Sequence, residues 1–244
     1  LGTECPLVKL YGRRLKDLDA KYAEQGVQVI GINANRQDNL TEIGAFARTS
    51  EIDFPILKDP RNEVADLFGA ERTPEVFVLD AERVIRYRGR IDDQYGVGYQ
   101  KAEASQSHVM EALDEVLAEK TVSQPYIEAV GCIIGRVRSV DAAAEVTYAN
   151  QISRIMNAHC VECHRDGEIA PFSLTSYDET VGWGEMIAEV VQDQRMPPWH
   201  ADPAYGHFSN DIRLLDEEKE QIYAWVDAGC PEGDVSNLPE PPQF

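Results

Sequence analysis

The chain has 244 residues, of which 43% are hydrophobic and 27% charged, a balance that excludes a wholly disordered protein and is ordinary for a globular one. The net charge of −20 argues against a nucleic-acid or anionic-membrane binder, and no apolar run of about 18 residues exists that would span a membrane. The charge is uneven, −5 over residues 1–140 and −15 over residues 141–244, which predicts two units with different surfaces.

Helical and strand patterns alternate through the first part of the chain. An amphipathic helix is predicted from Leu7 to Tyr22, with Pro6 in its first turn. The order favours an α/β fold with a mixed sheet, and because no strand precedes this helix, we expect the given sequence to begin within or just after a core strand. Further strands are predicted at 27–33, 54–57, 75–80 and 84–89, further helices at 41–49, 62–68 and 104–119, and a solvated loop at Asp92 and Asp93.

Cys5 lies directly before the first predicted helix in the run TECPLV (residues 3–8), and Thr73-Pro74 leads into the 75–80 strand. These two motifs resemble those of thioredoxin-like redoxins of the alkyl hydroperoxide reductase and thiol-specific antioxidant group. The resemblance covers about residues 1–135 and implies an α/β thioredoxin-like domain in which Cys5 faces a cis-proline, Pro74, with Thr73 supplying the preceding carbonyl. A helix N-terminus favours the thiolate, which makes Cys5 a candidate nucleophile.

Val8 stands where a disulfide oxidoreductase of this family carries the second cysteine of C-x-x-C, so Cys5 has no resolving partner nearby in the sequence. Cys132 is a candidate resolving thiol for a long-range disulfide. The alternative is that Cys132 is a buried free thiol in an apolar strand. Both interpretations stay open, because a sequence does not give the Cα separation that a disulfide needs.

The run Cys160-Val161-Glu162-Cys163-His164 is C-x-x-C-H, the attachment pattern of c-type haem. Two thiols one helical turn apart can reach the two vinyl groups of one porphyrin, and His164 then offers its imidazole to the iron. Zinc is the alternative, since C-x-x-C also begins many zinc ribbons, but no second pair of ligands follows at a matching spacing. The sequence therefore predicts one covalent haem c.

Three predicted helices accompany this motif, at 149–158, 178–192 and 215–228, the last with Asp216 as its N-cap. Together they resemble a class I cytochrome c domain, which is all-α, over about residues 146–235.

The run MPPWHADP (residues 196–203) resembles the ligand loop of haem-containing relatives of that family. Met196 on this proline-stiffened loop is the expected second axial ligand, with His200 and His207 as rivals. Trp199, His207 and Arg213 are candidates for haem contacts, and the alternative is that they are surface-loop residues.

The expected organisation is a redoxin domain at 1–136, a linker at 137–145, a cytochrome c domain at 146–236 and a proline-rich tail at 237–244 that leads into a further domain of the full-length protein. Cys230 has no role in this scheme. Because haem is attached to this motif on the outer side of the bacterial cytoplasmic membrane, the resemblance implies a periplasmic or otherwise extracytoplasmic protein.

The function expected from these motifs is electron transfer by the haem, with a fused redoxin module that is thiol–disulfide active through Cys5, and a redox partner protein whose basic surface would match the acidic chain. An electron carrier is favoured over an enzyme. Two alternatives stay open. In one, the redoxin domain is only a docking module and the haem is the only redox centre; in the other, the protein is a thiol- or haem-dependent peroxidase.

Overall fold

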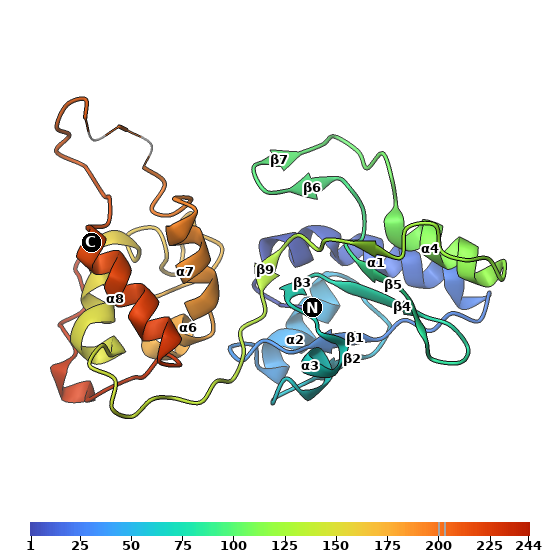
Figure 1. The fold of residues 1–244 in the computed structure, drawn as a ribbon, viewed down its shortest axis with the longest axis horizontal. Coiled ribbons are helices and arrows are strands. Elements are labelled where there is room, and N and C mark those ends of the chain that lie inside the picture. The colour runs from blue at the N-terminus through green and yellow to red at the C-terminus, as the bar shows by residue number, and fades with distance from the viewer. Residues whose placement is uncertain (200, 203) are drawn as a thin grey trace. The chain divides into compact units, whose positions relative to one another are not determined.

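The computed structural model describes residues 1–199, 201–202 and 204–244, so His200 and Pro203 of the expected ligand loop lie outside the described residues. The chain divides into two units, Leu1–Ile134 and Gly135–Phe244. The division falls just before the linker expected at 137–145. Each unit builds its own core and is considered separately (Figure 1).

The N-terminal unit alternates helices and strands. Local signals in the sequence fix several helix ends: Pro6 is the first helical residue of the first helix, and Asn39 caps the second by accepting the backbone N–H groups of Thr41 and Glu42. The elements are α1 (Pro6–Ala23), β1 (Gly31–Asn33), α2 (Leu40–Thr49), β2 (Ile56–Lys58), α3 (Glu63–Phe68), β3 (Arg72–Thr73), β4 (Val76–Leu79), β5 (Ile85–Gly89), β6 (Tyr95–Gly96), β7 (Tyr99–Gln100), α4 (His108–Leu117), β8 (Tyr126–Ile127) and β9 (Cys132–Ile133).

The strands of this unit pair in both directions. β1 pairs in parallel with β2, β4 pairs antiparallel with β5, β5 pairs in parallel with β8, and β3 pairs antiparallel with β9. Helices α1 and α4 lie on one face of the strands and α2 and α3 on the other (Figure 1). Tyr22 of α1 donates to the Asp114 carboxylate of α4 at 2.7 Å, which joins the two helices of the first face. The unit is therefore an α/β fold with helices on both faces of mixed strands.

Two expectations for this unit were wrong. The strand expected at 27–33 is confined to Gly31–Asn33, because the Val27 N–H instead bonds to the Tyr22 carbonyl at the end of α1. The helix expected at 104–119 begins only at His108, because the backbone N–H groups of Ser105 and Gln106 are held by the Asp93 carboxylate. The β6–β7 hairpin, which projects from the unit in Figure 1, was not expected.

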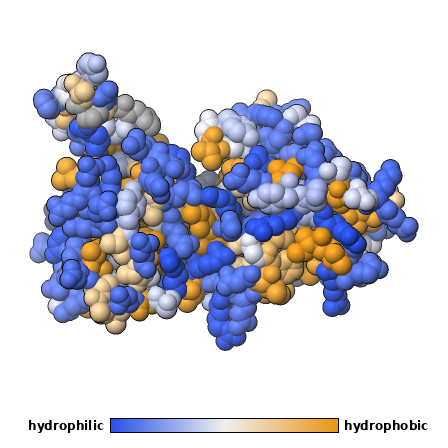
Figure 2. Space-filling view, in the orientation of Figure 1, coloured by the Kyte–Doolittle hydropathy of each residue, from blue (hydrophilic) through white to orange (hydrophobic). Residues whose placement is uncertain are grey.

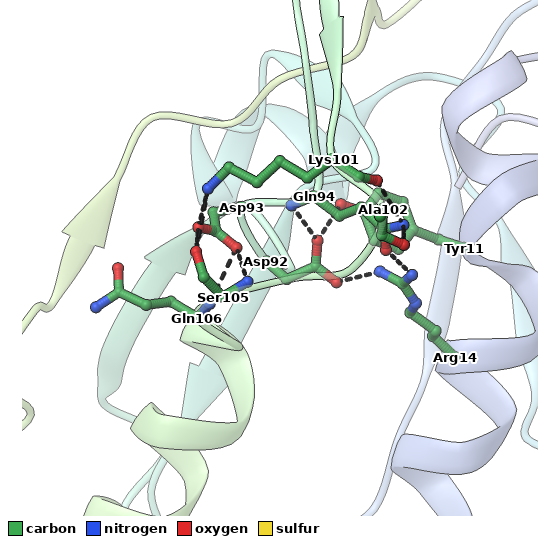
Figure 3. Close-up of polar contacts among 9 residues, drawn as sticks. All are labelled: Tyr11, Arg14, Asp92, Asp93, Gln94, Lys101, Ala102, Ser105 and Gln106. Carbon is green, nitrogen blue, oxygen red and sulfur yellow. Dashed lines mark hydrogen bonds and ion pairs between the residues drawn. The ribbon is translucent and has the colours of Figure 1, made fainter.

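The expectation of a solvated loop at Asp92 and Asp93 was also wrong (Figure 3). Asp92 is 3% exposed and accepts the Tyr11 hydroxyl at 2.7 Å and Arg14 Nη1 at 2.5 Å, both from α1. Asp93 accepts the Ser105 N–H at 2.8 Å on the approach to α4. Two adjacent carboxylates thus fasten the loop after β5 to α1 on one side and to the start of α4 on the other.

Replacing Asp92 with asparagine is expected to lower the free energy of unfolding of the N-terminal unit by about 2 kcal/mol, because Arg14 then loses its buried ion-pair partner. The loss stays below that of a fully buried pair because the Arg14 side chain is 35% exposed and can turn to water. Denaturant unfolding followed by circular dichroism measures it. Asp93→Asn is the matched control and should have a smaller effect, since that carboxylate is more exposed; equal losses would contradict this interpretation.

The C-terminal unit is helical wherever the structure shows regular elements in its described residues. Trp183, Trp225, Ile152 and Met156 are fully buried and form the centre of its core. Trp225 Nε1 donates to the Pro231 carbonyl at 3.0 Å, which satisfies its buried indole. The elements are a π-helix η1 (Tyr148–Ile152), α5 (Ser153–His159), α6 (Tyr177–Val181), α7 (Gly184–Gln192), α8 (Asp216–Asp227) and a 3₁₀ helix η2 (Val235–Asn237).

Two helix boundaries in this unit differ from expectation. The single helix expected at 178–192 is interrupted after Val181, where Gly182 is the C-cap of α6; the buried ring of Trp183, which follows, stacks on Phe172 at 4.0 Å. Asp216 is the first helical residue of α8 rather than its N-cap; Leu215 is the cap residue, and its N–H is bound by the Glu218 carboxylate at 2.7 Å. The acidic first turn of α8 still matches the positive end of the helix dipole.

The surface carries hydrophobic residues mostly in small separate groups. The face in view in Figure 2 is largely hydrophilic. The most exposed large hydrophobic side chains, Ile169 at 89% and Leu67 at 81%, belong to different units. In the part of the chain that the structure describes, no helix has the length and apolar composition needed to cross a membrane.

Candidate functional site

Cys5 is the residue immediately before α1, in the N-cap position. Its backbone is extended, and Pro6 begins the helix, so the thiol is at the helix end where the first N–H groups have no intrahelical acceptors. The residue is completely buried, at 0% exposed. The helix N-terminus therefore offers Cys5 partial positive charge in an environment from which water is excluded.

The structure brings Thr73, Pro74 and Cys132 to Cys5. The Thr73–Pro74 peptide is cis, and the Cys5 thiol donates to the Thr73 carbonyl at 3.2 Å. Strand β9 pairs Cys132 with Thr73, which places the Cys132 Sγ 2.7 Å from the Cys5 Sγ. Both cysteines are free thiols in this structure. Two residues 127 positions apart in the sequence are thus close enough to exchange a proton or to form a disulfide.

Gly131 makes this approach possible. Its φ is +159°, and a Cβ at this position would lie 2.2 Å from the Thr73 carbonyl oxygen. No side chain fits there, so β9 approaches β3 closely only with glycine before Cys132.

The two thiols have opposite pKa shifts. The hydrogen bond from the Cys132 thiol lowers the pKa of Cys5 to about 7; backbone N–H groups of Val8 and Leu7 act in the same direction, and burial opposes them. The bond to Cys5 and burial both raise the pKa of Cys132 well above its usual range. At neutral pH the arrangement therefore favours a Cys5 thiolate that accepts a hydrogen bond from a Cys132 thiol, which is the protonation state of a nucleophile beside its resolving partner.

A buried polar shell lies beside Cys5. The Asp38 carboxylate, 2% exposed, accepts the Thr3 N–H at 2.8 Å and Asn33 Nδ2 at 2.6 Å through one oxygen. Its second oxygen and the hydroxyls of Thr3 and Thr73 are buried and have no hydrogen-bond partner among the described residues. Because buried polar atoms of this kind are ordinarily satisfied, the shell has capacity for water or a small polar molecule.

In the C-terminal unit, the C-x-x-C-H residues follow α5 in a turn in which the His164 N–H bonds to the Cys160 carbonyl at 2.9 Å. His164 Nδ1 lies 3.1 Å from the Phe172 carbonyl, which can only accept, so Nδ1 carries the proton and Nε2 keeps a lone pair. Burial lowers the pKa of His164 and raises that of Cys160 to about 12, so both groups are neutral. A neutral imidazole with a free Nε2 and two thiols one turn apart fit a c-type haem.

Two buried indole N–H groups add to this fit. Trp183 Nε1 and Trp199 Nε1 have no hydrogen-bond partner within the described ranges. Trp183 stacks on Phe172, whose ring lies 4.9 Å from the His164 ring. The unpaired donor of Trp183, which is linked to His164 through Phe172, is suited to an acceptor from outside the chain.

The remaining candidates lie between α7 and α8. Met196 is 42% exposed and follows the end of α7, where its N–H bonds to the Val190 carbonyl. Trp199 packs edge-on against Phe208 at 5.6 Å, and His207 is exposed. Arg213 pairs with Asp211 on the surface rather than with a group in the core. Among the described residues, no cluster of three or more His, Cys, Asp or Glu side chains could hold a metal ion by itself.

Sequence reasoning missed Glu75 and Asp38. The Glu75 side chain is 3% exposed and pairs with Arg88 at 2.6 Å directly after Pro74. The sequence did contain a sign of the Glu75 pairing: a charged residue stands at the start of an otherwise apolar strand, and a charge buried there normally requires a partner of opposite charge. Asp38 had no comparable signal, because an aspartate among asparagines before a helix is also typical of a cap.

In comparisons with known proteins, the family match falls on the part of the chain that contains Cys5 and the Thr73–Pro74 peptide. A model of the AhpC/TSA family matches residues 2–88. The thiol-disulfide oxidoreductase ResA of Halalkalibacterium halodurans is 32% identical over 79 residues, which are 32% of this chain and 44% of ResA, so the chain spans less than half of that relative's length.

Two solved structures are also similar. A hypothetical protein, SMc02350, from Sinorhizobium meliloti 1021 is 30% identical with a TM-score of 0.52 over 57% of this chain and 78% of that protein. An uncharacterized conserved protein from Geobacillus kaustophilus is 26% identical with a TM-score of 0.49, over 56% of this chain and 74% of its own. The family match and the first structure support the expected fold for the N-terminal unit.

Proposed function

Because the N-terminal unit contains a thioredoxin-like redoxin domain of the AhpC/TSA type, we propose that the chain is a two-centre redox protein. Cys5 and Cys132 form a thiol–disulfide couple in the first unit, and the second unit carries one covalent haem c. The observation that carries the thiol proposal is the 2.7 Å separation of the two sulfur atoms. Cys5 has no second cysteine of a C-x-x-C motif, and Cys132 can act as its resolving partner instead.

The proposed reaction begins with attack of the Cys5 thiolate on one sulfur of a substrate disulfide. A mixed disulfide forms and one substrate thiolate leaves. Cys132 then attacks the Cys5 sulfur, which forms the Cys5–Cys132 disulfide and releases the second substrate thiolate. The substrate gains two electrons and the cysteine pair loses two; the one proton released is that of the Cys132 thiol, because Cys5 reacts as the thiolate. The Thr73 carbonyl accepts the Cys5 S–H whenever the nucleophile is protonated.

In the C-terminal unit, we propose that Cys160 and Cys163 bond to the porphyrin and that His164 and Met196 bind the iron. The free Nε2 of His164 supports its proposed role as a ligand to the iron. Bound there, the haem supplies one-electron transfer, and a Met/His pair raises its potential. The indole N–H groups of Trp183 and Trp199, which have no partner among the described residues, would be available as hydrogen-bond donors to such a group.

Such a haem protein would work outside the bacterial cytoplasm, where disulfides also persist. Its physiological partner would be a redox protein with a basic docking surface. The charge of −15 over residues 141–244 supports that choice, because complementary charge steers redox encounters.

Reduction of a small aromatic disulfide tests the thiol proposal. The reduced protein is expected to release two aromatic thiolates per chain, while Cys132→Ala releases one and stops at the mixed disulfide on Cys5. The thiolate absorbance is measured by stopped flow. Cys230→Ala is the control and should behave as wild type, because Cys230 belongs to the other unit. A Cys5→Ser variant with wild-type release would refute the proposal.

The second candidate function is reduction of a small hydroperoxide. It is favoured by the complete burial of Cys5 and by the unpaired hydroxyls of Thr3 and Thr73 beside it, which suit a small polar substrate better than a protein disulfide. Cys5 would take one oxygen to become a sulfenic acid and release an alcohol or water, and Cys132 would then displace water to form the disulfide. Faster oxidation of the dithiol by hydrogen peroxide than by the aromatic disulfide would favour this candidate.

A further inference from the structure

An ion pair between the buried Glu75 carboxylate and the partly exposed Arg88 adjoins the segment that contacts both cysteines. Glu75 follows the Thr73–Pro74 peptide, and its side chain is 3% exposed. One carboxylate oxygen accepts Arg88 Nε–H at 2.6 Å, and the other accepts the backbone N–H of Glu71 at 3.0 Å. Arg88 also donates to the Gly69 carbonyl at 2.5 Å. Both oxygens of this buried carboxylate are therefore engaged, which fixes its position.

Residues 71–73, whose backbone N–H groups bond to the Glu75 carboxylate at Glu71 and Arg72, also contact Cys5 and the strand that contains Cys132. The Thr73 carbonyl accepts the Cys5 thiol at 3.2 Å. The Glu71 carbonyl accepts the N–H of Ile134 at 3.0 Å, one residue beyond β9. A shift of this segment would therefore displace the acceptor of Cys5 and the strand of Cys132 at the same time.

Arg72 adds a side-chain bond to the same strand. Its Nη1 donates to the Gly131 carbonyl at 3.1 Å, while its backbone N–H points to the Glu75 carboxylate at 3.5 Å. β9 has only two residues paired with β3, so few backbone bonds hold it in register. The position of Cys132 therefore depends strongly on residues 71–73.

We propose that Glu75 is a positioning residue for the Cys5–Cys132 couple. Its negative charge holds Arg88 and the 71–73 segment in place, and that segment sets the separation of the two sulfur atoms. The inference rests on the thiol–disulfide function proposed above and adds to it a residue that acts through Thr73 and β9 rather than on sulfur.

Glu75→Gln tests this inference, because glutamine keeps the size of the side chain and removes the charge. The protein is equilibrated with mixtures of reduced and oxidised dithiothreitol, which exchange two electrons and two protons with the cysteine pair. The fraction of Cys5–Cys132 disulfide is read by alkylation and mass spectrometry. The equilibrium constant for disulfide formation is expected to fall about tenfold, equivalent to a potential about 30 mV less negative. Glu82→Gln, an exposed glutamate on the β4–β5 turn, is the matched control and should leave the potential unchanged.

A Glu75→Gln variant with the wild-type potential would overturn the inference. If that variant lacks the wild-type circular dichroism spectrum, Arg88→Lys takes its place and should shift the potential in the same direction, since lysine cannot bond Glu75 and Gly69 together. An unchanged potential in Arg88→Lys would also overturn it. Absence of any Cys5–Cys132 disulfide in the wild-type protein would instead refute the proposed thiol function.

Discussion

Replacing Cys132 with alanine is expected to raise the pKa of Cys5 from about 7 to 9 or above, because the hydrogen bond that contributes most to the low value is removed. Burial, which opposes ionisation, remains. The thiolate fraction of Cys5 at pH 7 then falls from about one half to about one hundredth, and after allowance for the greater nucleophilicity of a more basic thiolate, its reaction with a small disulfide slows about five- to eightfold. The fold loss is largest below pH 7, where Cys5 is mainly protonated in both proteins, and it shrinks as the pH rises. Above about pH 8 the more basic thiolate of the variant reacts at least as fast as that of the wild type.

The measurement is the pH dependence of thiolate ultraviolet absorbance. Wild type is compared with Cys5→Ser up to about pH 8, where burial keeps Cys132 protonated, and Cys132→Ala is compared with the Cys5→Ser/Cys132→Ala double variant. This observable does not require a reagent to reach the buried sulfur. Cys230→Ala, which removes a cysteine from the other unit, is the control and should leave the midpoint near pH 7. A midpoint that is the same in wild type and Cys132→Ala would mean that the two thiols do not interact.

Replacing Cys160 and Cys163 together with alanine is expected to abolish covalent haem attachment when the chain is produced in cells that mature c-type cytochromes. The intact mass should then equal that of the polypeptide alone, whereas the wild type should exceed its polypeptide mass by one haem. The double substitution should leave the Cys5–Cys132 couple active, because it lies in the other unit.

Met196→Ala is the matched control for this prediction. It should keep the covalent haem but change the visible spectrum and lower the midpoint potential, because the thioether ligand that raises the potential is lost. A wild-type protein with bare polypeptide mass, or with zinc in place of iron, would contradict the haem proposal. Unaltered spectra in Met196→Ala would remove Met196 as a ligand.

The helices and the central strands of the N-terminal unit could be predicted from apolar periodicity, because each buries one face against the core. The Asp92 network could not. An exposed acidic pair and a buried one have the same local sequence, and the partners Tyr11 and Arg14 are about 80 residues away on α1. The break before Trp183 had a local signal that was overlooked: Gly182 is the C-cap of α6 and Gly184 begins α7, on either side of a tryptophan that stacks on Phe172.

The candidate site was predictable where a motif is local and not where it depends on tertiary contact. Cys5, Pro74 and the C-x-x-C-H residues stand in short runs with a direct chemical meaning. The approach of Cys132 to Cys5 requires the β3–β9 register and the close backbone contact that glycine permits at position 131, neither of which a sequence displays. Glu75 was overlooked because its partner Arg88 lies on the neighbouring strand, in a pairing that residue spacing alone does not identify.

The proposed function depends on two cysteines 127 residues apart acting as one redox couple. Mild oxidation of the reduced protein, followed by digestion without reductant and mass spectrometry, examines this couple. We expect a cross-linked pair of peptides that contain Cys5 and Cys132, lost on reduction and absent from Cys132→Ala. Recovery of Cys5 as a free thiol, or linked to Cys230 or to a second chain, would contradict it.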